Sequence, residues 1–455
     1  MNNTICFFSF GNSHVFFDEL IKNRAFINLF QNPKIIFIAP NRTHKIFFEK
    51  NSFKVFYLND IDLSISKKFV KSDNESISTQ KKSIINLSAK KQEQIYFELE
   101  CFSLKIFEEE KVNYLIYSQA IEGLHGIILA KNAKNLGIHT FVPHACRFLN
   151  KSFFSSDQYE NLNLICDYNT LDFLFAENLI KNLSVNKKEN VLTKTEFKHK
   201  PFLIRLYYYF LRLIKHERFD LPRLKVSIEN NLGFLYEIFY SYNRFVSLRY
   251  FQKNIENIHQ KIIFYPLQYS PESSINIPNS YFVDQDRLID LIRFNMPNDY
   301  LLYIKEHPSM FGRRARDFYK KINKKSGVRM LSPSISSLAI IDKSDLIISV
   351  SGTACLEAFL LKKPSITFGK TFFSELTNIY GINYNDLKAT LKKYLLRKIT
   401  DKEILEGIAR VSANTYDFQI GAVEFDSRLY AKKNIDSFIT ALEKEFEVRS
   451  IKENN

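Results

Sequence analysis

The stretch LIISVSGTACLEAFLLKKPSITFG, residues 346–369, carries the pattern that decides the fold. An apolar run is followed by a Ser-Gly-Thr turn, a helical stretch near 354–361 and a second apolar run. Two parallel strands need a crossover connection, which is usually a helix. The order therefore predicts a strand, a helix and a parallel strand, and an α/β fold.

The same alternation extends in both directions from this stretch. Downstream of residue 260 the runs KIIFYPL, LLYIK and VRML predict further strands, with helices near 285–294, 314–323 and 334–341. Ser332 is the expected N-cap of the last of these helices, with Pro333 at its first position. In the first third, strands are predicted at 4–10, 34–39, 53–58, 114–117 and 140–142.

Two α/β units joined by a helical segment follow from this pattern. We expect two Rossmann-like domains that face a cleft, a helical linker and C-terminal helices. The expected boundaries are 1–175, 176–258, 259–390 and 391–455.

Composition supports a folded chain of this size. The 455 residues are 45% hydrophobic and 25% charged, which is ordinary for a folded protein of two or three domains. Lys and Arg number 64 against 49 Asp and Glu, so the net charge is +15. A nucleic-acid-binding protein is the less favoured interpretation, because the charge is dispersed and no zinc-finger, helix-turn-helix or RNA-binding motif is present.

Disulfide-rich, zinc-binding, membrane-spanning and secreted proteins are disfavoured by the cysteines, the apolar runs and the N-terminus. The five cysteines lie far apart without CxxC spacing, which argues against a disulfide framework or a zinc site and favours a reducing cytoplasm. No apolar run approaches the ~18 residues of a membrane-spanning helix. The N-terminus is typical of a strand rather than a signal peptide. We expect a cytoplasmic protein, with the inner face of the membrane as an open alternative.

Polar residues follow three strands of the second half, where a parallel sheet binds its ligands. Lys305 ends the run LLYIK, with His307 and Pro308 close behind it, and a Lys and a His at a strand end can hold an anion. Ser349 ends the run LIIS, and Ser351, Gly352 and Thr353 follow it at a helix start, which suits a phosphate but also an ordinary N-cap.

Three further polar residues of this half are candidates. Glu357 is either a ribose ligand or an acid favoured by the helix dipole. Gln268 and Glu272 follow the first strand and either contact a base or sugar or are loop polar groups.

The first half offers comparable strand-end residues. Glu122 is the candidate general base, with His125 and His144 as less favoured ones. His14 and Arg147 are candidates for binding an acceptor. For each of these five residues, a structural or solvated role is the competing interpretation.

The series PLQYSPESS, YIKEHP and SPSISSLAIIDKSDLIISVSGTACLEAFLLKKPSITFG resembles bacterial capsule and surface-polysaccharide biosynthesis glycosyltransferases of the GT-B architecture. The likeness covers roughly 260–370, and includes the His-Pro element of the Kdo transferases, polysialyltransferases and CDP-glycerol glycerophosphotransferases. It implies that His307, Pro308, Ser351, Gly352 and Thr353 bind a cytidine nucleotide's phosphate. Glu357 has no second Glu at the EX7E spacing, since position 365 is Ser, which argues against a UDP-sugar retaining mechanism of that type.

The resulting hypothesis is a metal-independent glycosyltransferase that needs no cofactor beyond a nucleotide-sugar co-substrate. It would move a Kdo- or sialic-type sugar from a CMP-linked donor, held by the C-terminal domain, to a glycan or lipid-linked acceptor on the N-terminal domain. CDP-polyol phosphotransfer in teichoic-acid-like synthesis, and a non-catalytic chain, remain alternatives. The basic aromatic segment 201–219 is either a linker helix between domains or a contact with anionic membrane.

Overall fold

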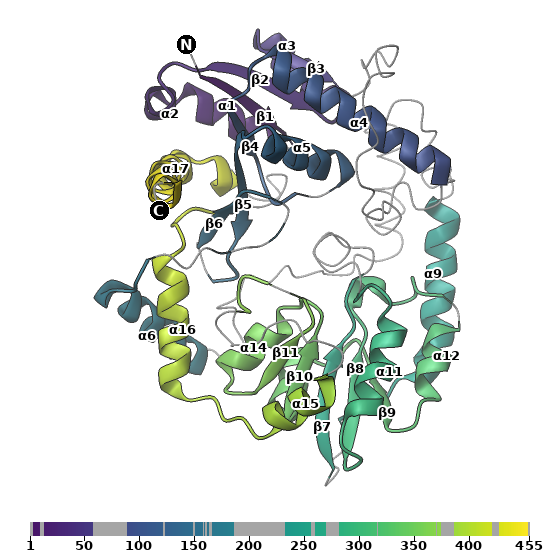
Figure 1. Ribbon diagram of the computed structural model, residues 1–455. Helices are drawn as coiled ribbons and strands as arrows, with labels where there is room; N and C mark the ends of the chain where they lie inside the picture. The colour runs from purple at the N-terminus through teal and green to yellow at the C-terminus, as the bar shows by residue number, and fades with distance from the viewer. Residues whose placement is uncertain are drawn as a thin grey trace.

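Two mainly parallel β-sheets with flanking helices make up the computed structural model, one from the first third of the chain and one from beyond residue 260 (Figure 1). In Figure 1 the N-terminal sheet lies in the upper half of the view and the C-terminal sheet in the lower half. The expected α/β class is confirmed. The described residues are 3–9, 13–57, 89–121, 123–148, 151–157, 159, 162, 166–185, 233–255, 260–269, 282–315, 317–369, 371–374, 386–420 and 427–453.

The N-terminal half alternates strands and helices as the sequence predicts. Its elements are β1 (Thr4–Phe8), α1 (His14–Lys22), α2 (Arg24–Leu29), β2 (Lys34–Ala39), α3 (Arg42–Lys50), β3 (Lys54–Tyr57), α4 (Ala89–Glu109), β4 (Tyr114–Tyr117), α5 (Leu124–Asn135), β5 (His139–Ala145), β6 (Ser152–Ser155) and α6 (Thr170–Val185). The strand order is β3-β2-β1-β4-β5-β6. β1 to β5 are parallel, and their apolar runs are continuous because helices cover both faces of the sheet.

The sequence prediction missed β6 and made β5 too short. β5 continues past Val142 to Ala145, and this extension pairs antiparallel with β6, so that Val142 lies opposite Ser155. β6 is four residues long and follows no helix, so the strand–helix alternation gave no signal for it.

The C-terminal half repeats the same topology. Its elements are α9 (Gly233–Ser247), η4 (Leu248–Tyr250), β7 (Lys261–Pro266), α11 (Gln285–Asn295), β8 (Tyr300–Lys305), η6 (Pro308–Met310), α12 (Phe318–Asn323), β9 (Val328–Leu331), α13 (Ser337–Lys343), β10 (Leu346–Ser349), α14 (Ala354–Leu360), β11 (Ser365–Thr367) and α15 (Leu387–Leu395). The order is β11-β10-β7-β8-β9, all parallel. When the strands are numbered within each half, the first five strands of the N-terminal sheet have the order 3-2-1-4-5. The C-terminal sheet has the same order when it is read from β9, and this is the Rossmann type of arrangement.

One predicted helix start is wrong. α13 begins at Ser337 with Ser336 as its N-cap, so Ser332 does not cap it. Ser332 instead donates its N–H to the carbonyl of Gln252 at 2.9 Å, and Gln252 donates to Met330 at 2.8 Å. The chain at Gln252 thus pairs with the edge of the sheet beside β9.

The C-terminal helices return toward the first half. They are α16 (Asp401–Ala413), η8 (Ser427–Tyr430) and α17 (Lys432–Glu453). α16 runs beside α6, and residues of both join one buried apolar cluster with the C-terminal sheet. α17 packs on the N-terminal sheet, where Phe438 contacts Phe16 and Phe154. Residues from opposite ends of the chain therefore share one core.

The two halves also touch directly. Phe153 of β6 and Phe372, in the loop after β11, are both buried with ring centroids 5.8 Å apart. The loop after β11 lies at the carboxyl edge of the C-terminal sheet, so this edge faces the N-terminal half at that point. The segment 201–219 lies outside the described residues. Within the described parts of the chain, every helix is too short or too polar to cross a membrane.

Candidate functional site

The loops that follow β7, β8 and β10 come together at the carboxyl edge of the C-terminal sheet, as the sequence analysis predicts. Pro266 at the end of β7 lies in register with Lys305 at the end of β8. Leu267 then donates its N–H to the Lys305 carbonyl at 2.8 Å. Buried Gln268, one residue further, reaches across to the loop after β10.

Gln268 binds the turn between β10 and α14. With its carboxamide oxygen facing the turn, Gln268 accepts the backbone N–H of Ser351 at 2.9 Å and of Gly352 at 2.7 Å. In this orientation the same oxygen accepts the Ser349 hydroxyl at 2.7 Å. Two of the N–H groups expected to meet a phosphate thus already have an acceptor within the chain. The sequence could not show this, because Gln268 lies more than eighty residues upstream.

Gly352 is required here by close packing. A Cβ added at this position would lie 2.6 Å from Ser349 Oγ and 3.0 Å from the Gln268 amide. The Gly352 N–H also lies 2.8 Å from Ser349 Oγ. A glycine at this turn therefore lets the strand end, the turn and Gln268 meet.

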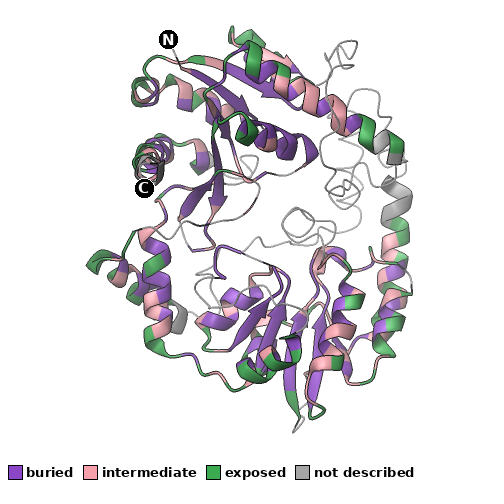
Figure 2. Ribbon diagram, in the orientation of Figure 1, coloured by how far each residue is buried: buried purple, intermediate pink, exposed green. Residues whose placement is uncertain are grey.

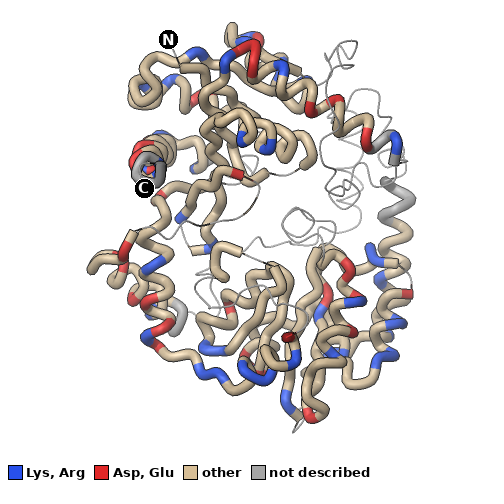
Figure 3. The backbone as a smooth tube through the Cα atoms, viewed as in Figure 1, with Lys and Arg blue, Asp and Glu red and all other residues tan. Residues whose placement is uncertain are grey.

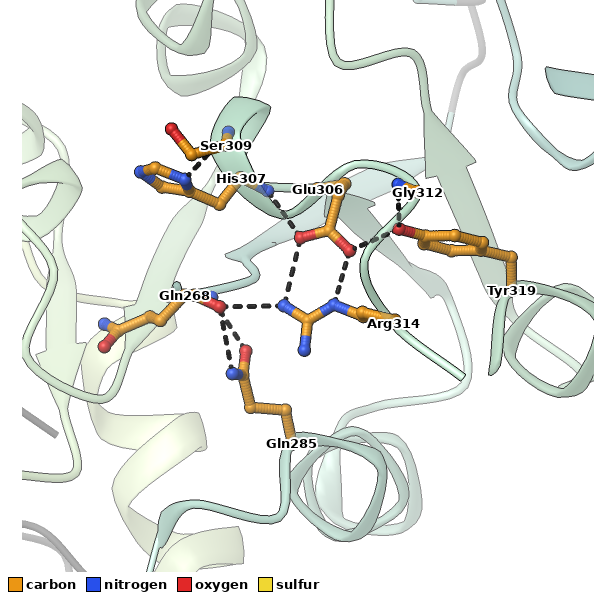
Figure 4. A network of polar contacts seen from close by, with 8 residues as sticks. All are labelled: Gln268, Gln285, Glu306, His307, Ser309, Gly312, Arg314 and Tyr319. Carbon is orange, nitrogen blue, oxygen red and sulfur yellow. Dashed lines mark hydrogen bonds and ion pairs between the residues drawn. The ribbon is translucent and has the colours of Figure 1, made fainter. Parts of the chain in front are cut away.

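A buried network fixes the loop after β8 (Figure 4). The carboxylate of Glu306, fully buried, accepts hydrogen bonds from the His307 N–H at 2.7 Å and from the Tyr319 hydroxyl at 3.0 Å. Arg314 pairs with both oxygens of the same carboxylate. Arg314 Nη2 also donates to the Gln268 carbonyl at 2.7 Å, which ties the loops after β7 and β8 together.

Neither Glu306 nor Arg314 was predicted as a site residue. Glu306 stands inside the quoted KEHP motif, but its partners lie eight and thirteen residues further on, where no pattern marks them. The one signal in the sequence is that this acid directly follows an apolar strand, where a buried charge would need a partner; the identity of that partner is not marked.

Lys305 brings a buried amine to this edge. Its side chain is largely hidden, and Nζ donates to the Ser337 hydroxyl at 3.1 Å. Burial lowers the pKa of Lys305, while the charges of Glu357 and Glu306 act in the opposite direction. The two acids therefore only partly offset the effect of burial on the Lys305 ammonium, and a bound anion would stabilise its charged form further.

His307 lies at the start of η6 with Pro308 at the first helical position. Its Nδ1 accepts the Ser309 N–H at 3.2 Å, so the neutral ring carries its proton on Nε2. Burial lowers the pKa of His307 to about 4, and the positive charges of Lys305 and Arg314 act in the same direction. The ring is neutral near pH 7 and offers an N–H donor.

The remaining predicted residues of this half are placed as follows. Thr353 is the N-cap residue of α14, without a side-chain cap bond, and Glu357 lies in the first turn of that helix. Ser351 and Gly352 are partly exposed. Glu272 lies outside the described residues.

In the N-terminal half, His14 begins α1 after β1. Its ring lies 5.0 Å from that of His44, a buried residue in the first turn of α3 that sequence reasoning missed. The two histidines follow neighbouring parallel strands, β1 and β2, which is why they meet. Burial lowers the pKa of His14.

Of the three candidate base residues, the structure describes His125 and His144, and both are buried. Glu122 lies outside the described residues, and His125 is buried in α5 with its ring 5.2 Å from Phe8. His144 is buried in β5, its Nε2 2.8 Å from Ser155 Oγ, and burial lowers its pKa to about 3. Since the Ser155 hydroxyl donates to the Asp157 carbonyl, His144 donates to Ser155. Arg147 follows β5 and is half-buried.

Two Rossmann-type sheets and a polar, partly cationic carboxyl edge define a two-domain α/β protein of the GT-B type. Residues 188–406 match the model of the family described as capsule polysaccharide biosynthesis protein. The match confirms the family resemblance seen in the sequence.

Solved structures give only remote likenesses. The UDP-GlcNAc 2-epimerase of Methanocaldococcus jannaschii in complex with UDP-GlcNAc and UDP is 14% identical, covers 90% of this chain and 99% of its own, and has a TM-score of 0.28. The KpsC β-Kdo 2,7 transferase of Thermosulfurimonas dismutans is 13% identical over 78% of this chain and 96% of its own, with a TM-score of 0.34. A glycosyltransferase from Rickettsia africae is 11% identical over 97% and 99%, with a TM-score of 0.28. Such values do not carry an activity over to this chain. No curated protein matches it.

Proposed function

We propose that this protein is a glycosyltransferase of capsule polysaccharide synthesis that uses a nucleotide-activated, CMP-linked sugar. The observation that supports this most is the pairing of a buried Lys305 ammonium and a neutral His307 N–H at the edge where Gln268 meets the turn 349–353. Within the proposal, residues 259–390 bind the donor and residues 1–175 the acceptor.

Lys305 and His307 are the proposed phosphate ligands. Burial disfavours the charged form of Lys305, and a phosphate oxygen would add a counter-charge that favours it. His307 adds a directed donor through Nε2, held by the bond from Ser309 to Nδ1. Ser351, Gly352, Thr353 and Glu357 would line the nucleotide, with Ser349 and Gln268 holding the turn.

The same groups would assist the chemical step. The bond between the anomeric carbon and the phosphate oxygen breaks, and the acceptor hydroxyl oxygen forms the new glycosidic bond. Negative charge grows on the leaving phosphate, where a preorganised cation and N–H donor stabilise it. We therefore propose that transfer needs no metal ion.

The acceptor hydroxyl must give up its proton to a base. Glu122 is the proposed base, and His14 and Arg147 are proposed to bind the acceptor. His125 and His144 are weaker choices: both are buried, and the pKa of His144, at about 3, is far from neutral. The proposed acceptor is a glycan or a lipid-linked molecule. Work at the inner face of the membrane is part of the same proposal.

Donor-dependent transfer by the purified protein tests the proposal. CMP-, CDP-, UDP- and GDP-sugars are compared, with CDP-glycerol and CDP-ribitol as further donors, in the presence and absence of EDTA. We expect turnover with a CMP-sugar that EDTA leaves intact. Turnover with the CDP-polyols alone would favour the phosphotransferase alternative. Absence of both turnover and nucleotide binding at millimolar concentration would refute both.

Gln268→Glu is a sharper test of the donor site. The glutamate retains an acceptor for the N–H groups of Ser351 and Gly352, but it adds a negative charge beside the proposed phosphate position. We expect affinity for CMP to fall by at least about tenfold, the change that ~1.4 kcal/mol produces. Affinity for uncharged cytidine should change little, which serves as the internal control. Equal CMP affinity of the unchanged protein and the Gln268→Glu variant would place the phosphate elsewhere.

A further inference from the structure

Exposed positions occur along α9 and η4 (Figure 2), and several of them carry large apolar side chains. Phe245 is 76% exposed, Leu248 51%, Phe239 49% and Ile238 44%. Single exposed apolar residues are ordinary on protein surfaces, but a continuous stripe marks a contact site. Ile238, Phe245 and Leu248 recur near the helical repeat, so they form one stripe.

The opposite side of α9 is fixed to the body of the protein. Asn243 Nδ2 donates to the Gly312 carbonyl at 3.3 Å, and Arg244 Nε donates to the Phe311 carbonyl at 2.7 Å. Gly312 has a φ of +85°, and a Cβ there would lie 2.5 Å from the Tyr240 carbonyl oxygen. This tight seat orients the helix, so the apolar stripe faces outward.

Basic side chains lie on η4 and on the elements packed beside it. Arg313 lies over the ring of Tyr240, with 5.4 Å from its Cζ to the ring centroid. η4 packs beside α12, which carries exposed Lys320, and exposed Arg249 and Lys253 lie in and after η4. Figure 3 shows Lys and Arg along α12, on the side of the molecule where α9 lies, with Asp and Glu in the adjoining loops.

We propose that the outer face of α9 and η4 binds the surface of an anionic lipid bilayer. Apolar side chains of an interfacial helix enter the boundary between headgroups and acyl chains, while flanking cations meet anionic headgroups. This surface has both features. The proposal deepens the membrane placement proposed above, but its test is separate, because binding is measured without turnover.

A second copy of the chain is the less suitable occupant. A two-fold contact would bring the same cationic rim against itself, and like charges at close range oppose association.

The absence of tryptophan from the sequence gives a clean probe. Phe245→Trp places one fluorophore on the proposed face, and Phe294→Trp places one at a phenylalanine of α11 that is 72% exposed. Each variant is mixed with vesicles of phosphatidylglycerol and phosphatidylethanolamine, with phosphatidylcholine vesicles, or with buffer. We expect a shift of emission to shorter wavelength, and quenching by brominated acyl chains, for Phe245→Trp with the anionic vesicles alone.

The second arm measures co-sedimentation with the anionic vesicles. Arg249→Glu with Lys253→Glu should lose most of the bound fraction, whereas Lys392→Glu with Lys393→Glu on α15 should retain it. An unchanged emission spectrum for Phe245→Trp, equal shifts for both tryptophan variants, or a shift that follows protein concentration without vesicles would each overturn the proposal. The last result would instead indicate a second copy.

Discussion

Arg314 meets Glu306 in a two-pronged pair, with Nε on one carboxylate oxygen and Nη2 on the other. The side chains of the two residues are 9% and 0% exposed. Because Arg314 also holds the Gln268 carbonyl, one guanidinium joins the loop after β7 to the loop after β8. The proposed donor site therefore rests on a pair that itself need not touch the donor.

Arg314→Met should destabilise the protein by about 3–5 kcal/mol, since it leaves the Glu306 charge buried without its partner. Arg397→Met is the matched control, because Arg397 pairs with Glu403 at 3.1 Å near the surface, where such pairs contribute about 0–1 kcal/mol. Denaturant unfolding of both variants gives the comparison. Equal losses in the two variants would contradict the structural role given to Arg314.

The proton on His307 should respond to an anion. Without ligand, its pKa lies at about 4, because burial and the nearby charges of Lys305 and Arg314 disfavour the imidazolium. A bound phosphate would partly neutralise those charges, so we expect CMP to raise the pKa of His307 and cytidine not to. Titration of the His307 ring proton by NMR, assigned with His307→Gln, measures this. An identical titration with and without CMP would count against His307 as a phosphate ligand.

The sequence predicted the loops of this site better than the contacts within them. Strand ends could be located because apolar runs and crossover helices alternate, and parallel topology alone brings the ends of β7, β8 and β10 to one edge. Gln268 and Gly352 were both singled out, but their contact spans more than eighty residues and depends on strand order. The sequence held no signal for the partner of Glu306.

Other features depend on long-range packing. His44 lies beside His14 only because β1 and β2 are neighbours, and the apolar face of α17 gives no indication of which sheet it covers. A local pattern indicates that a helix has a buried side, whereas the element that covers this side is decided by the whole fold.

Acid should weaken the fold through His144. Its pKa, lowered by burial to about 3, lies below the ordinary value of about 6.5, so the unfolded chain binds the proton more readily. Stability is complete above about pH 6.5 and falls as pH drops toward 3, by up to about 1.4 kcal/mol per pH unit from this group. His144→Gln should flatten this part of the pH dependence between pH 7 and 5. His139→Gln, at an exposed position of the same strand, should leave it unchanged.

Removing the Phe438 side chain should damage the N-terminal half even though this residue lies near the C-terminus. Phe438 is fully buried, and its ring lies 5.1 Å from that of Phe16, on α1, and 5.4 Å from that of Phe154. Phe438→Ala therefore opens a cavity in a core shared by both ends of the chain, at a cost of about 3–5 kcal/mol. Leu396→Ala, at a side chain that is 85% exposed, should change stability by less than about 0.5 kcal/mol. Hydrogen exchange then locates the effect: faster exchange in β1 and β6 of Phe438→Ala is expected, and faster exchange confined to α17 would mean that the helix is dispensable to the N-terminal sheet.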